Sequence, residues 1–555
     1  MKTPLLALAA ALLASPAFAD TLIDNANGIQ VDVNGRLQRF TGLLIGDDGK
    51  VVRRLGPGDS RPNADTIVDA RGQTLLPGFI DGHGHVMDLG FAAMTLQLTG
   101  TSSIADLQQR LRAYAAAHPD DEWIIGFGWN QELWPEKRFP TAADLDSIVF
   151  DRPVVLERVD GHALVANSAA MKAAGVTAAT ADPDGGKIER DSTGNPTGLF
   201  VDAAKALIQD KVPAHTQTQE DKAFALAQHE LLSFGVTGVG SMSTSLADWN
   251  TFRRSGEAGD LQVRLMVYLL GLDPLKTIPH PTGWMYDDRL RAVGVKFFAD
   301  GALGSRGAWL KQPYADKPDT RGLQFHSDAE LLAQENAAAA AGFQTATHAI
   351  GDAANAQVIG VYEKLHAEYP GDRRWRIEHF QIVDPADIPR MKPIGAVASM
   401  QPTHQTSDRL MAEARLGPER LKGAYAWQTV EKLGIPLAFG TDFPVESPNP
   451  FPGLSAAISR QDLNGQPPGG WIPSERLTLG QALHAYTRGS AYAGFAEKRI
   501  GALDAGKWAD FILVDRDPTK VDPQQLGRTQ VFQTWIAGKK VWERPARAEQ
   551  PERGR

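Results

Sequence analysis

Apolar runs of strand length recur through the middle of the chain and alternate with Ala- and Leu-rich stretches long enough to form helices. This alternation is typical of βα units around a parallel sheet. Eight runs qualify as strands: Thr74–His85, Val236–Met242, Gln262–Leu270, Ala292–Asp300, Gln344–Ile350, Trp375–Gln381, Ala396–Gln401 and Pro436–Asp442. Eight such units close a (β/α)8 barrel, so we predict an α/β fold with a TIM barrel over residues 74–495.

The two ends of the chain follow a different pattern. Residues 20–73 show short alternating apolar runs broken by Asn-Gly and Asp-Gly turns, which predict short antiparallel strands. Lys507–Val514 and Thr529–Trp542, within residues 496–545, carry a similar signal. We expect residues 20–73 and 496–545 to pair into one small β-sandwich beside the barrel.

Two other segments interrupt or extend this plan. Residues 101–233, between the first two predicted strands, are too many for one crossover, so we expect an inserted segment with its own helices near the barrel mouth. Residues 546–555 are rich in Pro, Glu and Arg and are expected to be a frayed tail.

Residues 1–19 match a signal peptide: Lys2 gives a positive start, Leu5–Leu13 is apolar, and Ala17-Phe18-Ala19 is a cleavage site of the A-x-A type. The alternatives are a membrane anchor and a buried first helix, but the apolar stretch is shorter than the ~20 residues that span a bilayer. We therefore predict a periplasmic or secreted protein with no membrane insertion after signal cleavage.

Composition narrows the partners. The chain has 555 residues, of which 43% are hydrophobic and 22% charged, as is ordinary for a soluble enzyme. Its net charge of −9 argues against a nucleic-acid surface. We expect a small-molecule substrate as the partner, with a homo-oligomer as an open alternative. The chain has no cysteine, so a bound metal would need nitrogen and oxygen ligands.

Candidate metal ligands lie at the ends of four predicted strands. His83 and His85 end the first; because side chains alternate along a strand, both imidazoles point to one face. His348, His379 and Asp442 end the fifth, sixth and eighth strands. Strand ends on one face of a barrel build active sites. Each histidine alone is more often structural, but the set predicts a site for Zn²⁺, with Mn²⁺ or Fe²⁺ as alternatives.

Lys296 lies within the apolar fourth strand. Desolvation there favours its neutral amine, which can take up carbon dioxide and become a carbamate able to bridge two metals. An ion pair with Asp300, on the same strand face, is an equally good interpretation.

The chain resembles the amidohydrolase superfamily, and within it the YtcJ-like, amidohydrolase-3 branch. The resemblance covers nearly the whole mature chain. It rests on these segments: Leu76–His85, Gly126–Asn130, Asp160-Gly161-His162, Phe298–Arg306, Ser399–His404, Gly440–Val445 and Gly501–Asp510. Many relatives have another small residue in place of Gly84, which we expect to loosen the turn without removing a ligand.

The resemblance implies two zinc ions: His83, His85 and Asp442 would hold the first, His348 and His379 the second, and a carboxylated Lys296 would bridge them. It further implies an exported metal-dependent hydrolase of a non-peptide or short-peptide C–N bond, such as an N-acyl, N-formyl or cyclic amide, using metal-activated water. Asp442 is then expected to shuttle the proton to the leaving nitrogen. Hydrolysis of another bond, an isomerase, and a non-catalytic periplasmic metal- or solute-binding protein are the alternatives.

Four further residues are candidates for catalysis or substrate binding. His162 could hydrogen-bond substrate or the tetrahedral oxyanion, or only brace the insertion. Arg306 could clamp a carboxylate, or form an ion pair between loops. His404 follows the seventh strand and is expected to orient either substrate or a loop. Trp129 could form an aromatic wall, or pack in a core.

Overall fold

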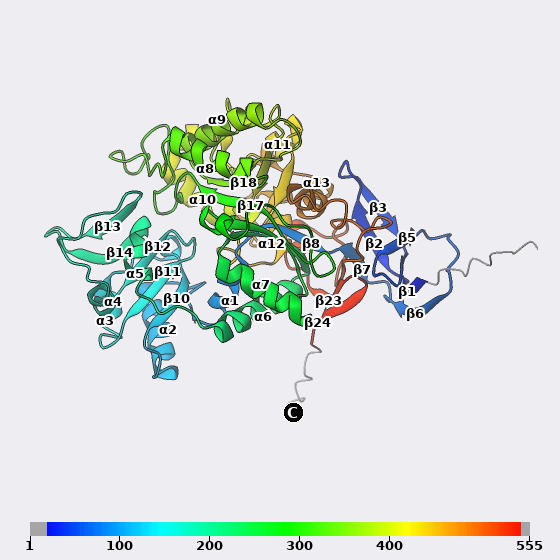
Figure 1. The fold of residues 1–555 in the computed structure, drawn as a ribbon, viewed down its shortest axis with the longest axis horizontal. Coiled ribbons are helices and arrows are strands. Elements are labelled where there is room, and N and C mark those ends of the chain that lie inside the picture. The colour runs from blue at the N-terminus through cyan, green and yellow to red at the C-terminus, as the bar shows by residue number, and fades with distance from the viewer. Residues whose placement is uncertain (1–18, 546–555) are drawn as a thin grey trace, which may run out of the picture.

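The computed structural model describes residues 19–545, so the predicted signal up to Phe18 and the predicted tail 546–555 lie outside the described residues. Its centre is a nearly closed barrel of eight parallel strands, which run in sequence order around the sheet (Figure 1). The strands are β8 (Phe79–Gly84), β15 (Val236–Thr244), β16 (Arg264–Leu270), β17 (Leu290–Phe298), β18 (Gln344–Ala349), β19 (Arg376–His379), β20 (Val397–Met400) and β21 (Leu437–Phe439). Each overlaps one of the eight predicted runs.

Helices between the strands cover the sheet, and their apolar faces share its largest hydrophobic core. They include α1 (Val86–Ala92), α6 (Gln217–Ser233), α7 (Leu246–Ala258), α8 (Asp328–Ala340), α9 (Asp352–Glu368), α10 (Pro402–Leu416), α11 (Trp427–Leu433), α12 (Pro450–Ser459) and α13 (Leu479–His484). Several begin with a reciprocal capping box, such as Ser245 with Asp248 and Ser327 with Glu330, which satisfies the first backbone amides.

Hydrogen bonds join β8 and β21, the first and last strands of the barrel sheet. The Asp442 amide donates to the His83 carbonyl at 2.8 Å, and the His85 amide donates to the Phe443 carbonyl at 2.8 Å. The buried Asp81 carboxylate also accepts bonds from the Thr441 amide and hydroxyl. These bonds therefore fix His83, His85 and Asp442 relative to one another.

Two sheets are built from the ends of the chain. The first has the order β24-β23-β22-β7-β2-β3 and the second β5-β4-β1-β6. Their strands are β1 (Ala19–Asp24), β2 (Asn27–Val31), β3 (Leu37–Phe40), β4 (Gly42–Ile45), β5 (Val51–Leu55), β6 (Ala64–Asp69), β7 (Thr74–Pro77), β22 (Phe511–Val514), β23 (Val531–Ile536) and β24 (Lys539–Glu543). One apolar cluster contains residues from both sheets, as two packed layers require.

Two expectations about this region were wrong in detail. Pairing in the N-terminal piece is not purely antiparallel, since β1 pairs with β6 and β2 with β7 in parallel. The first predicted strand is also two strands, because β7 joins the terminal sheet and only β8 joins the barrel. The break falls at Gly78, where an added Cβ would lie 2.3 Å from Thr237 Oγ1.

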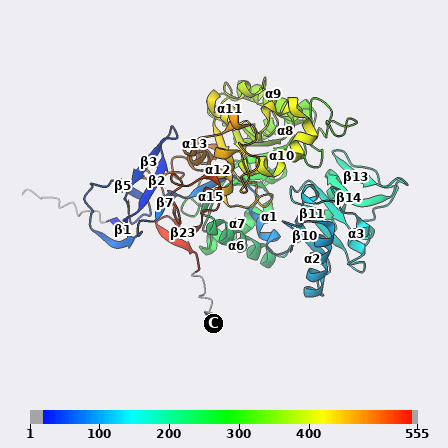
Figure 2. The ribbon, with the colours of Figure 1, turned by 180° about the vertical axis from the view of Figure 1, so that it is seen from behind.

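The inserted segment contains a sheet that the sequence analysis did not predict. Its order is β13-β14-β12-β11-β10-β9, formed by β9 (Leu96–Gln97), β10 (Ile124–Trp129), β11 (Val154–Arg158), β12 (Ala163–Ala166), β13 (Gly186–Arg190) and β14 (Pro196–Asp202). Helices α2 (Ile104–Ala117), α3 (Ala142–Asp146), α4 (Ser168–Ala173) and α5 (Ala206–Gln209) accompany it. Figures 1 and 2 show this segment and the terminal sheets on opposite sides of the barrel.

Among residues 19–545, no helix combines the length and hydrophobicity that crossing a membrane requires.

Candidate metal centre

A cavity of about 770 Å³ lies between the barrel and the inserted segment, and its lining includes five of the predicted ligands. These are His85, Lys296, His348, His379 and Asp442; His83 lies behind them and is fully buried. Residues of the inserted segment, among them His162, line the cavity as well. Strand ends far apart in the sequence therefore converge on one cavity.

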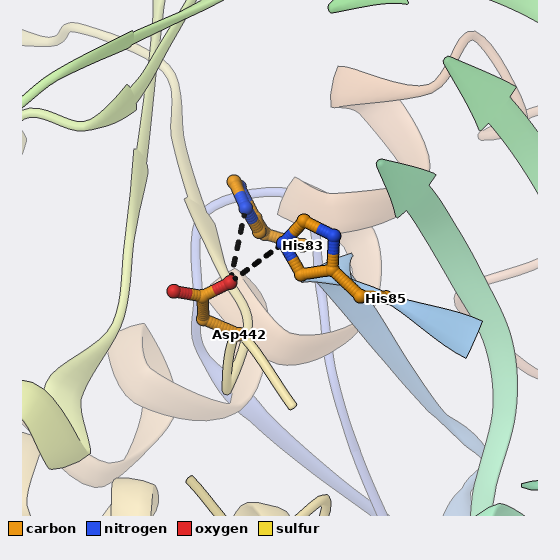
Figure 3. Close-up of side chains that lie close together, drawn as sticks. All are labelled: His83, His85 and Asp442. Atoms are coloured by element: carbon orange, nitrogen blue, oxygen red, sulfur yellow. Dashed lines mark ion pairs between the residues drawn. The ribbon is translucent and has the colours of Figure 1, made fainter. Parts of the chain in front are cut away.

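His83, His85 and Asp442 form the tightest group. The Nε2 atoms of His83 and His85 lie 3.2 and 3.1 Å from the same oxygen, Asp442 Oδ1 (Figure 3). That oxygen is buried and has no hydrogen-bond partner among the described residues. Two imidazole nitrogens and an unpartnered carboxylate oxygen fit a divalent cation.

The electrostatics of Asp442 agree with this fit. Burial opposes ionisation of the carboxyl, but the imidazoles of His83, His404 and His85 outweigh it and hold the pKa of Asp442 well below its usual range. Burial lowers the pKa of His83, His348 and His379. His83, His348 and His379 are therefore neutral and the Asp442 carboxylate is ionised, which are the forms that bind metals.

A second group adds His404 to His379 and Asp442. His404 Nε2 lies 3.3 Å from Asp442 Oδ2, and His404 Nδ1 lies 3.4 Å from Glu446. Burial lowers the pKa of His404, but the two carboxylates outweigh it and raise the pKa to about 10. The His348 and His379 rings, predicted as the second metal pair, lie 4.6 Å apart between centroids.

Backbone conformation turns two of these side chains into the cavity. Arg376 and Glu378 face the barrel interior, where they bond to groups on other strands. Strict alternation would therefore point His379 away from the interior. His379 has φ 72° and Asp442 has φ 60°, a left-handed conformation that non-glycine residues rarely adopt. Such strain concentrates at functional sites.

Glu378 was not predicted as part of the site. Its Oε2 lies 2.6 Å from His83 Nδ1, and Arg376 holds both carboxylate oxygens at 2.7 and 3.0 Å. Burial opposes its ionisation, but Arg376 and His83 outweigh it and keep the pKa of Glu378 far below its usual range. The carboxylate fixes the proton on His83 Nδ1 and leaves Nε2 for a ligand role. The sequence signal that could have identified Glu378 is its spacing of two residues from Arg376, which places both side chains on one face of the strand.

Lys296 lies beside the first group. Its Nζ is 3.4 Å from His83 Nε2, and burial lowers the pKa of the amine to about 8. The alternative pairing with Asp300 is not found, because the Asp300 carboxylate accepts the backbone amides of Ile350, Gly351 and Trp309.

His162 reaches the cavity from the inserted segment. Its Nδ1 lies 2.7 Å from Asp202 Oδ1, and its ring centroid lies 5.2 Å from that of His348. Burial lowers the pKa of His162, but Asp202 outweighs it and the pKa is raised. Asp202 was not predicted from the sequence. It has φ 48°, so its carboxylate, too, is presented from a left-handed backbone conformation.

Two predicted substrate contacts are corrected. Trp129 is fully buried in the core of the inserted segment, where its indole N–H donates to the Leu156 carbonyl at 2.8 Å, so it does not line the cavity. Arg306 pairs with Asp316 at 2.9 Å outside the cavity lining. The interpretations as core packing and as an ion pair between loops are the correct ones.

Gly84 has a packing role that the sequence analysis did not predict. A Cβ at this position would lie 2.2 Å from Cε1 of Phe443, the residue after Asp442. The glycine therefore makes room for the Phe443 ring.

Comparison with known proteins gives matches over most of the chain. The family model described as the amidohydrolase family matches residues 66–542. YtcJ of Bacillus subtilis, whose name places it among the amidohydrolases, is 34% identical over 86% of this chain and 90% of its own. The N-substituted formamide deformylase of Arthrobacter pascens is 28% identical over 95% and 98%. An uncharacterized metal-dependent hydrolase from Pyrococcus horikoshii is 30% identical, with a TM-score of 0.72 over 91% of this chain and 99% of that one.

Proposed function

The chain belongs to the amidohydrolase family of metal-dependent hydrolases, and from this premise we propose that it hydrolyses a non-peptide or short-peptide C–N bond. An N-acyl, N-formyl or cyclic amide is the substrate type, and the name of the formamide deformylase relative supports an N-formyl amide. The observation that carries the proposal is the buried, unpartnered Asp442 Oδ1 between two imidazoles at the wall of a large cavity.

The metal is proposed to be zinc, as two ions, with other divalent transition metals as alternatives. His83, His85 and Asp442 would hold the first ion, and His348 and His379 the second. A carboxylated Lys296 would bridge them, which its burial and lowered pKa support because only the neutral amine reacts with carbon dioxide. When bound, the ions supply a Lewis acid that polarises the carbonyl and lowers the pKa of water.

The chain's own residues handle the proton and the developing charge. Asp442 is ionised and buried, so it can take a proton from water and deliver it to the leaving nitrogen. His404, 3.3 Å from Asp442 Oδ2, would orient that carboxylate as well as substrate. His162 would donate a hydrogen bond to the tetrahedral oxyanion from the inserted segment.

Export and architecture complete the proposal. We propose that residues 1–19 are removed on export, which leaves a periplasmic or secreted enzyme for a small molecule; a homo-oligomer remains open. The signal-like pattern of residues 1–19 supports export, and the acidic net charge argues against a nucleic acid as partner. The fold would be a TIM barrel with a β-sandwich made from both chain ends, which the shared apolar cluster of the two terminal sheets supports.

The test is turnover by protein loaded with zinc and checked for metal content by elemental analysis. The panel contains N-formyl, N-acetyl and cyclic amides. Asp442→Asn should lose at least 100-fold in kcat, whereas Asp151→Asn, an exposed loop change, should match wild type. Metal-loaded protein that hydrolyses no member of the panel would refute the proposed function. Full turnover by Asp442→Asn would refute the role of Asp442 in proton transfer.

A further inference from the structure

The cavity wall is acidic. Seven carboxylate side chains line it, against three from lysine and arginine. Asp442 and Lys296 belong to the proposed metal centre; without them, six carboxylates face one lysine and one arginine. The six are Asp88, Glu132, Glu157, Asp160, Asp408 and Glu446. His404 is also cationic, but its two ring nitrogens already face Glu446 and Asp442.

The arginine, Arg158, and the lysine, Lys205, are already bonded to protein groups. Arg158 donates to Gln131 at 2.9 Å, to Asn130 at 3.2 Å and to Asp160, and its side chain is 4% exposed. Lys205 donates to Glu157 and to the Gly161 carbonyl. Recognition of a substrate carboxylate usually uses an arginine with free N–H groups. Arg158 already pairs with Asp160 and Lys205 with Glu157, so neither offers a substrate carboxylate an unpaired positive charge.

Asp88 is the carboxylate most available to substrate. It lies on α1, three residues after His85, and its side chain is 66% exposed while lining the cavity. Its ion-pair partner is His85 Nδ1 at 3.8 Å, beyond hydrogen-bond distance. Apolar side chains share the wall, including Phe91, Phe127 and Phe298. A hydrocarbon chain ending in a cationic or neutral group suits this lining.

We propose that the site takes amides of neutral or cationic amines and rejects substrates with a free carboxylate, with Asp88 as the specificity-determining residue. This rests on the proposed function, because it names the substrate class of the same site. An anionic end would lose its hydration beside carboxylates and meet no unpaired cation. This narrows the proposed bond to the non-peptide kind: N-acyl amino acids and dipeptides are excluded, whereas N-acylated monoamines and diamines are accepted.

The test uses three amides that differ only in the charge at the end of the chain. The acyl group is the one that the panel above shows to be turned over best. It is attached to 1,5-diaminopentane, hexylamine or 6-aminohexanoic acid, and kcat/KM is measured at pH 8. We expect the cationic amide to equal or exceed the neutral one, and the anionic amide to fall at least tenfold below it. Added salt should narrow these differences.

Asp88→Asn should lower the ratio of kcat/KM for the cationic amide to that for the neutral amide at least threefold, at unchanged metal content. Asp151→Asn should leave that ratio as in wild type. An anionic amide turned over as fast as the neutral one, or a ratio that Asp88→Asn does not change, overturns the inference. Turnover of cyclic amides alone would also overturn the inference, because a cyclic amide has no separate amine chain. A panel without turnover refutes the proposed function instead.

Discussion

Glu378→Gln removes a buried negative charge that holds His83 and Arg376 together. The wild-type carboxylate meets His83 Nδ1 with one oxygen, at 2.6 Å, and Arg376 with both. In the amide, one oxygen becomes an NH2 group, which must face a donor on either His83 or Arg376. The substitution therefore loses at least one charge-assisted bond and leaves the Arg376 guanidinium buried without its counterion.

Two effects of different size follow from this geometry. Loss of the partner that orients a metal-binding histidine typically weakens metal affinity by about 10–100-fold. Breaking a buried ion pair by removing one charge costs about 3–5 kcal/mol of stability. Arg376 keeps hydrogen bonds to the Gly82 carbonyl, Tyr268 and Ser399, so we expect the lower end of that range.

Competition with a chromophoric chelator measures zinc affinity, and urea denaturation of the metal-free protein measures stability. Glu335→Gln is the matched control, because Glu335 is equally buried but bonds to Thr347 instead of a candidate ligand. Glu378→Gln protein that binds zinc as tightly as wild type would refute the reasoning. Equal losses of affinity in both variants would refute it as well, because they would make the effect one of general core damage.

Other parts of the site and core can be tested in the same way. Asp202→Asn should lower kcat at least tenfold with little change in KM, because the neutral amide no longer stabilises positive charge on the His162 imidazole; steady-state kinetics that show only a KM effect would contradict this. Gly84→Ala should displace Phe443 and lower the free energy of unfolding by about 1–3 kcal/mol through overpacking. A variant that unfolds at the same temperature as wild type would contradict this. Burial raises the pKa of Glu335 to about 8 from an ordinary 4.5, so the folded protein keeps a proton that the unfolded chain releases. That contribution to stability is full below pH 4.5 and is lost as the pH rises through 8, by about 1.4 kcal/mol per pH unit in between. Glu335→Gln should therefore gain stability relative to wild type from pH 5 to pH 9 in urea denaturation; parallel stability curves would count against the shift.

Local patterns along the chain were sufficient for the barrel strands and for the residues at their ends. An apolar run followed by His83 and His85 predicts a buried strand and a ligand pair, and the same reasoning identified His348, His379 and Asp442. It was less reliable where one residue type has several common uses. Trp129 and Arg306 fit a substrate wall and a carboxylate clamp by type, but neighbours invisible in the sequence placed them in a core and an ion pair.

The inserted segment shows a second limit. Its sheet joins short strands by both parallel and antiparallel pairing, whereas the sequence analysis expected helices there. The segment nevertheless supplies His162 and Asp202, whose contact at 2.7 Å joins residues 40 positions apart. No periodicity within a single strand predicts such a pair.

The sequence by itself determined which runs form the barrel strands and which candidate nitrogen and oxygen ligands stand at their ends, because strand length and alternation are local properties of the chain. Only the tertiary structure decided where those side chains point and what holds them. The left-handed backbone at His379 and Asp442, and the Glu378 carboxylate on His83, 295 positions away, depend on closure of the barrel. Closure brings β8 beside β21 and buries charged side chains from distant strands together. No local sequence pattern shows how those side chains pair.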